Sequence, residues 1–96
     1  MLNCFIKAMN PIFKEAINLY KKRELKKAQK ICLKAIKSEP NNFDFLHLLG
    51  IIAFQNKNYK DADELFKKAI NLKPNIADVY INRGILLNKM KKLDDA

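Results

Sequence analysis

The sequence predicts an all-α fold of stacked antiparallel helix pairs, about two and a half of them. Three observations support this prediction: similar residues recur every 34 positions, apolar residues within each period follow helical spacing, and proline or asparagine marks the helix ends. The 34-residue spacing relates Pro40 to Pro74, Ala28 to Ala62 and Ala96, Ala35 to Ala69, Gly50 to Gly84, Ile17 to Ile51 and Ile85, Ile36 to Ile70, and Asp44 to Asp78. Agreement among so many positions indicates one repeated structural unit.

The first pair of helices is expected within residues 11–36. Apolar residues recur at i, i+3 and i+4 between Pro11 and Lys22, and again over residues 25–36. Asn10 can cap the first helix, and Pro11 suits its first position because the N–H that proline lacks would have no intrahelical partner there. Pro40 ends the second helix, because the residue before a proline is displaced from the α region.

The same capping asparagines, helix-ending proline and apolar spacing predict the next three helices. They are expected over residues 43–56, 59–72 and about 76–90. Asn42 and Asn75 can cap the third and fifth helices, and Pro74 ends the fourth. The links at 23–24 and 57–58 are so short that the helices on either side must lie antiparallel.

At these offsets the sequence resembles the tetratricopeptide repeat family, whose 34-residue pattern has leucine-glycine, aromatic, alanine and proline positions. The middle repeat matches at Phe43, Leu46, Leu49, Gly50, Phe54, Tyr59, Ala62, Phe66, Ala69 and Pro74. The first repeat matches at Ile12, Ala16, Leu25, Ala28, Cys32, Ala35 and Pro40, and the third at Tyr80, Gly84, Leu93 and Ala96. Glu15 and Arg83 replace the family's leucine in the first and third repeats. The resemblance covers residues 9–96 and implies a right-handed superhelix, an α-solenoid.

This register divides the chain into four segments. They are an N-terminal extension at 1–8, repeats at 9–42 and 43–76, and a partial third repeat at 77–96 with its first helix and a truncated second helix. Leu86, Leu87 and Met90 would normally be covered by that second helix. We therefore expect a fragment of a longer array that can self-associate through its uncapped C-terminal end.

Composition argues against catalysis and against metal or cofactor binding. The sequence has no threonine, one serine and one histidine, and its two cysteines, Cys4 and Cys32, are 28 residues apart without a C-x-x-C motif. Cys32 lies on an apolar helical stripe and is expected in the core. The acidic residues at helix starts suit the helix dipole without a metal. No stretch is long and apolar enough to span a membrane, and no signal peptide is evident, so a cytoplasmic, non-catalytic protein without cofactors is expected.

The net charge of +9 is concentrated in the first repeat. Residues 1–40 carry 10 basic and 3 acidic side chains (+7), and residues 41–96 carry 9 and 7 (+2). Such a surface could bind RNA weakly and non-specifically. Sequence-specific nucleic-acid binding is not expected, because only Arg23 and Arg83 could supply bidentate base contacts.

The resemblance places ligand recognition in a concave groove lined by the first helix of each pair. In this register nine residues face it: Phe13, Ile17, Tyr20, His47, Ile51, Phe54, Ile81, Ile85 and Asn88. Seven of the nine are apolar or aromatic, which favours a peptide or an amphipathic helix of a partner protein. The alternative is that they pack between helices. The family's clamp for a peptide carboxylate is not expected, because Asp78 would repel it and only Asn82 could donate to it.

The sequence therefore predicts a protein-interaction scaffold. Two alternatives remain open at this point: the repeat arm of a larger glycosyltransferase- or sulfotransferase-like enzyme whose catalytic domain follows Ala96, and electrostatic RNA binding through the first repeat.

Overall fold

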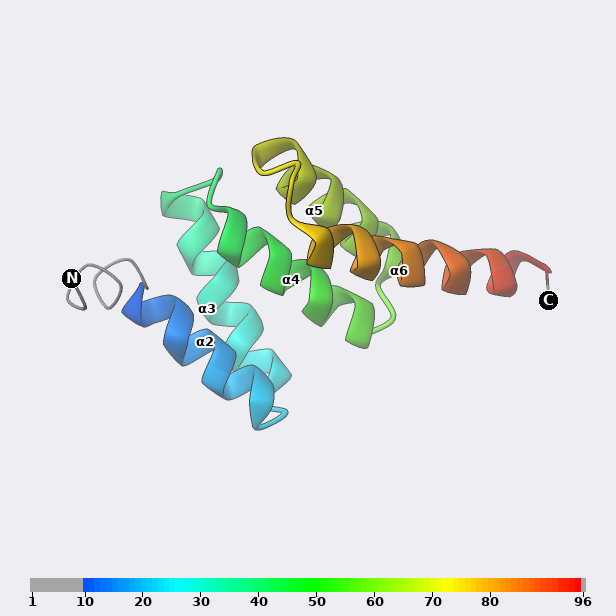
Figure 1. The fold of residues 1–96 in the computed structure, drawn as a ribbon. Coiled ribbons are helices and arrows are strands. Elements are labelled where there is room, and N and C mark those ends of the chain that lie inside the picture. Colours follow the sequence, from blue (N-terminus) through cyan, green and yellow to red (C-terminus); the bar gives the residue numbers. More distant parts are fainter. Residues whose placement is uncertain (1–9, 96) are drawn as a thin grey trace.

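The computed structural model describes residues 10–95, which form five α-helices and no strand (Figure 1). The N-terminal extension predicted at 1–8, Cys4 and Ala96 lie outside the described residues. The helices are α2 (Pro11–Lys21), α3 (Leu25–Ser38), α4 (Phe43–Gln55), α5 (Tyr59–Leu72) and α6 (Ala77–Asp95). The first four follow the predicted bounds to within two residues, so the predicted all-α repeat fold is confirmed.

The helices pack in chain order. In Figure 1, α2 lies against α3 and α4 against α5, and α6 continues the row beyond α4. The principal-axis extents are 51 × 29 × 22 Å. A molecule more than twice as long as it is thick fits an array in which each unit contacts only its neighbours.

Asparagine side chains cap the first turns of α2 and α4. The Asn10 side chain accepts a hydrogen bond from the Ile12 N–H (2.8 Å), and Asn42 accepts one from the Phe45 N–H (3.3 Å). These caps satisfy N–H groups that the first helical turn leaves without partners. Because α6 begins at Ala77, Ile76 rather than the predicted Asn75 occupies its capping position.

The turn inside each complete pair depends on one left-handed residue. Arg23 (φ 65°) and Lys57 (φ 66°) occupy equivalent positions 34 residues apart. A non-glycine residue in this region costs roughly 1–2 kcal/mol. Packing of the two helices against each other offsets that cost.

The third repeat differs from its prediction. The equivalent of Lys57 is Lys91, yet α6 runs unbroken from Ala77 to Asp95, without the predicted truncated second helix. Among residues 10–95 no further helix packs against α6 to offset a left-handed turn. Continuation of the helix keeps the i to i−4 hydrogen bonds, and Lys91 and Lys92 are good helix formers.

Two apolar clusters share the central helix. One joins α2, α3 and α4 around Ala16, Ala28 and Cys32, and the other joins α4, α5 and α6 around Phe66 and Leu86. Helix α4 contributes buried residues to both clusters, so it is sandwiched between its neighbours. The prediction that Leu86 would await a further helix is wrong, because Leu86 is fully buried against α4 and α5.

Met90 is half-buried and packs against the same cluster as Leu86. Of the three residues predicted to need a further helix, only Leu87 keeps a large exposed fraction, 42%.

Cys32 is a core residue, as its place on the apolar stripe predicted. Its side chain is fully buried, and this burial raises the pKa of the thiol to about 11. A thiol with so high a pKa is almost entirely neutral near pH 7 and is a poor nucleophile.

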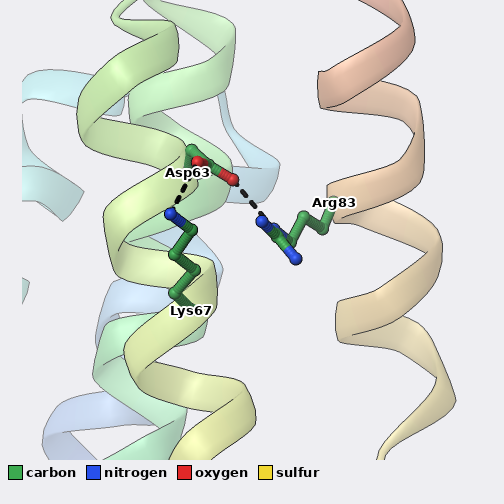
Figure 2. A network of polar contacts seen from close by, with 3 residues as sticks. All are labelled: Asp63, Lys67 and Arg83. Carbon is green, nitrogen blue, oxygen red and sulfur yellow. Dashed lines mark hydrogen bonds and ion pairs between the residues drawn. The ribbon is translucent and has the colours of Figure 1, made fainter.

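Arg83 holds α6 against α5. Its Nε lies 2.8 Å from Asp63 Oδ1, and Lys67 Nζ lies 3.5 Å from Asp63 Oδ2 (Figure 2). The arginine that replaces the family's leucine therefore substitutes an ion pair between helices for apolar packing. Asp63 is one of the acidic residues near a helix start, for which the sequence suggested only a role at the helix dipole, and it forms this link.

No helix of residues 10–95 is both long enough and apolar enough to cross a bilayer.

Candidate binding groove

The candidate groove is formed by α2, α4 and α6, the first helices of the three repeats, with α4 in contact with both of the others. A pocket of about 180 Å³ opens there, lined by Tyr20, Ile51, Phe54, Gln55, Phe66, Asn82 and Ile85. Four of these lining residues, Tyr20, Ile51, Phe54 and Ile85, were predicted from the sequence. The pocket thus draws predicted residues from all three helices.

The remaining predicted residues lie in different environments. Phe13 packs edge-on against Phe45, with ring centroids 5.5 Å apart, and Ile17 packs against the N-terminal cluster. These two residues pack between helices, which was the alternative to lining the groove. Ile81 (58% exposed) and Asn88 are exposed, and neither lines the pocket.

Two polar links cross the groove from one repeat to the next. Gln55 Nε2 donates to the Tyr20 hydroxyl oxygen at 3.0 Å, and Asn82 Nδ2 lies 2.9 Å from His47 Nε2. Because the amide nitrogen can only donate, His47 Nε2 accepts, which requires the neutral ring with its proton on Nδ1. These bonds fix the relative positions of the groove helices.

Sequence reasoning missed Gln55 and Phe66 as groove residues and considered Asn82 only as a clamp residue. Gln55 is 34 positions from Lys21 and from Lys89, neither of which was predicted to face the groove, so the period gave no signal for it. Nor could the partner of each side chain be predicted, because both hydrogen bonds join residues 35 positions apart. The bond to His47 engages the one donor that the clamp prediction had identified, which agrees with the argument against a carboxylate clamp.

The aromatic surroundings of His47 give it an unusual electrostatic environment. Its ring lies 5.6 Å from the ring of Phe43 and 6.1 Å from that of Phe66. Burial lowers the pKa of His47 below its ordinary 6.5, and the negative charges of Asp78 and Asp44 partly oppose this shift. The neutral form demanded by the Asn82 contact is therefore the favoured one.

This pKa shift makes stability depend on pH. Because the pKa is lower in the folded chain than in the unfolded chain, the unfolded state binds more protons as the pH falls through 6.5. We expect the urea midpoint to be lower at about pH 5.5 than at about pH 7.5, a range in which surface carboxylates stay ionised. Replacing His47 with glutamine, which can still accept the Asn82 hydrogen bond, should flatten this dependence. An unchanged slope in the variant would contradict the assignment to His47.

The basic surface predicted for the first repeat is present on α3 and the preceding turn. Its lysines and Arg23 are exposed, and Lys27 pairs with Glu24 at 3.3 Å. Tyr20, the aromatic residue next to this basic run, accepts a hydrogen bond from Gln55 in the groove. Among the described residues, no group of three or more histidine, cysteine or acidic side chains could hold a metal ion.

Comparison with known proteins identifies the family of this fold. Two family models described as tetratricopeptide repeat match residues 43–76 and 65–96, which together span more than half of the 96-residue chain. The chain belongs to the tetratricopeptide repeat family. The C-terminal repeat-containing domain of a putative FK506-binding protein from Plasmodium falciparum superposes with a TM-score of 0.82 at 26% identity, over 88% of this chain and 56% of that one.

Curated relatives contain this tetratricopeptide array as a small part of larger proteins. Human protein O-mannosyl-transferase TMTC3 is 34% identical over 60% of this chain, and human DnaJ homolog subfamily C member 7 is 45% identical over 49%. A UDP-N-acetylglucosamine–peptide N-acetylglucosaminyltransferase from Caenorhabditis elegans is 35% identical over 72%. The chain spans only 6% to 10% of the length of these relatives.

Proposed function

We propose that this tetratricopeptide array is a non-catalytic scaffold that binds an apolar peptide segment or amphipathic helix of a partner protein in the groove of α2, α4 and α6. The observation that supports it most is the row of isoleucines across the groove. Ile51 and Ile85 line the pocket, where Ile51 is half-buried and Ile85 is 55% exposed, and Ile81, four residues before Ile85 on α6, is 58% exposed. A partner that covered the two exposed side chains would remove apolar surface from water in a pocket whose shape already exists.

Charge at the two ends of the groove supports an oriented ligand. Asp44 and Asp78 lie in the first turns of α4 and α6. Lys21 lies in the last turn of α2, and Lys89 in the C-terminal half of α6. All four side chains are exposed. A ligand with a basic residue toward the aspartates and an acidic residue toward the lysines would match this gradient, which acts on specificity more than on affinity.

The histidine and the buried cysteine, the side chains most suited to catalysis, have structural roles in the described residues. His47 bonds to Asn82, and Cys32 is fully buried. This supports a role in binding rather than in catalysis.

Peptide selection on the intact chain tests the groove. We expect peptides displayed on phage and panned against the chain to carry apolar residues at helical spacing. Their affinity should fall at least about tenfold in the Ile85→Asp variant, because a buried carboxylate in the bound state is costly. Calorimetric titration of a selected peptide measures the change.

The matched control is Ile12→Asp, since Ile12 is equally exposed (54%) but does not line the groove pocket. It should bind the selected peptides as tightly as the parent chain. Equal affinity for the parent chain and the Ile85→Asp variant would overturn the groove proposal. Circular dichroism of both variants checks that helicity is retained.

A second candidate function is that of a repeat arm in a larger transferase. It is favoured by the relatives named as an O-mannosyl-transferase and an N-acetylglucosaminyltransferase, in which the matching segment is 6% of the length. The gene sequence downstream of residue 96 tests it. An in-frame transferase domain would support this role, and an immediate stop codon would contradict it.

A further inference from the structure

The exposed side of α3 carries charge of one sign only. The helix contains no acidic residue, and its five charged side chains, all exposed, are Lys26, Lys27, Lys30, Lys34 and Lys37. At 3.6 residues per turn they lie within an arc of about 100° around the helix, opposite the buried Ala28 and Cys32. We call these five residues the lysine face of α3.

The second repeat shows that the fold does not require this charge. The positions 34 residues later, on α5, hold Lys60, Asp61, Glu64, Lys68 and Asn71, two basic, two acidic and one neutral. Like charges three or four positions apart, such as Lys26 and Lys30, destabilise a helix. Within residues 10–95 only Lys27 of the lysine face has an ion-pair partner, Glu24. The lysine face therefore opposes the stability of α3, and an external anion would relieve the repulsion.

The composition of the lysine face favours a phosphate backbone over other anionic partners. Protein interfaces are enriched in aromatic residues and arginine and depleted in lysine. Lysine contacts a phosphate as a point charge and needs no bidentate geometry. A planar anionic membrane fits less well, because α5, the equivalent helix of the next repeat, exposes Asp61 and Glu64.

The same face discriminates among nucleic acids. Single strands are held largely by aromatic side chains that stack on their bases, and α3 contains none. Duplex DNA is read in its major groove by arginine, asparagine or glutamine side chains, which the lysine face lacks. Double-stranded RNA is bound mainly through its phosphates and its shape. From Lys26 to Lys37 the face is about 16 Å long, enough to contact several phosphates of one strand.

We propose that the lysine face of α3 binds the phosphate backbone of double-stranded RNA without sequence preference. Binding releases counterions from the RNA, so the affinity falls steeply as the salt concentration rises. Helix α3 does not line the groove pocket, so this site does not rest on the proposed groove function.

The probe is a fluorescently labelled RNA duplex of about 16 base pairs and mixed sequence. Its anisotropy is followed as the intact chain is added, at salt concentrations from about 50 to about 200 mM. The test variant is Lys30→Glu with Lys37→Asn, which installs the residues that α5 carries at these positions. We expect its affinity at the lowest salt to fall at least about tenfold. The slope of log affinity against log salt should flatten by about two, one for each lost phosphate contact.

The matched control is Lys91→Glu with Lys92→Asn, two exposed residues at the far end of α6 from α3 (Figure 1). It makes the same two kinds of substitution and so changes the net charge equally. We expect it to bind the duplex within about twofold of the parent chain, because charges beyond roughly 10 Å are screened at 0.1 M salt.

Thermal unfolding followed by circular dichroism separates binding from folding. The test variant should keep its helicity and unfold at or above the midpoint of the parent chain. The reason is that the new glutamate would lie four positions from Lys26 and from Lys34, where opposite charges stabilise a helix. A lower midpoint would mean that the lysines serve the fold, and it would overturn the proposal.

Four binding results would also overturn it. The first is that the chain does not bind the duplex at about 50 mM salt. The second is that the test and control variants lose affinity equally, because net charge alone would then explain binding. The third is tighter binding of single-stranded RNA or of duplex DNA. The fourth is that vesicles containing phosphatidylserine bind the parent chain but not the test variant, because a membrane would then be the occupant.

Discussion

Replacing Phe66 with alanine is expected to lower the free energy of unfolding by about 3–5 kcal/mol. The ring is 1% exposed, and it joins α4, α5 and α6 in the second apolar cluster. No side chain at Gly50 can move into the space, so most of the cavity would remain empty. A chain of this size is stable by only about 5–15 kcal/mol, so the loss would be a large part of the total.

Urea denaturation followed by circular dichroism measures this loss. Cys32→Ala is the matched control, because Cys32 occupies the equivalent position of the first repeat and is equally buried. Removal of one sulfur beside Ala16 leaves a much smaller cavity, so we expect a loss of roughly 1 kcal/mol. Similar losses for the two variants would contradict the conclusion that the Phe66 ring joins α4, α5 and α6 in the second apolar cluster.

The helices were predictable because their signals are local and repeated. Asn10, Asn42, Pro40 and Pro74 act within a few residues of the ends they mark, and the two prolines recur at the 34-residue period. The left-handed turns at Arg23 and Lys57 have no glycine to reveal them. Their positions followed from the helices on either side.

The end of the third repeat was predicted wrongly for a related reason. Leu93 and Ala96 match the family pattern, but a turn before them needs a second helix whose packing offsets the left-handed residue. Among residues 10–95 that helix is absent, and local helix propensity prevails over the period. Tertiary contacts, not the local sequence, decide whether the turn forms.

Sequence reasoning named four of the residues that line the pocket, but it did not give the polar contacts there. Periodicity placed Ile51 and Ile85 on equivalent faces, and the pocket brings them together. The pairing of His47 with Asn82 depends on the separation and rotation of α4 and α6, which no local pattern encodes. The same holds for Arg83 and Asp63, which are 20 positions apart on different helices.

Opposite effects are expected when the two glycines are each replaced with alanine, although both are interior to helices and 34 positions apart. Alanine favours a helix over glycine by about 1 kcal/mol in either place. At position 84 the new methyl group meets no atom within 4 Å, so Gly84→Ala should stabilise the chain by roughly 0.5–1 kcal/mol. At position 50 the methyl group would lie 2.7 Å from the ring of Phe66.

Overpacking of this kind costs about 1–3 kcal/mol, which exceeds the gain in propensity. We therefore expect Gly50→Ala to destabilise the chain by a net amount of up to about 2 kcal/mol, because Phe66 packs between α4 and α5 and can move only if the helices separate. Urea midpoints of the two variants, measured beside the parent chain, make the comparison. A shift of both midpoints in the same direction would mean that Phe66 moves aside readily. The close packing of α4 against α5 would then not explain the glycine at position 50.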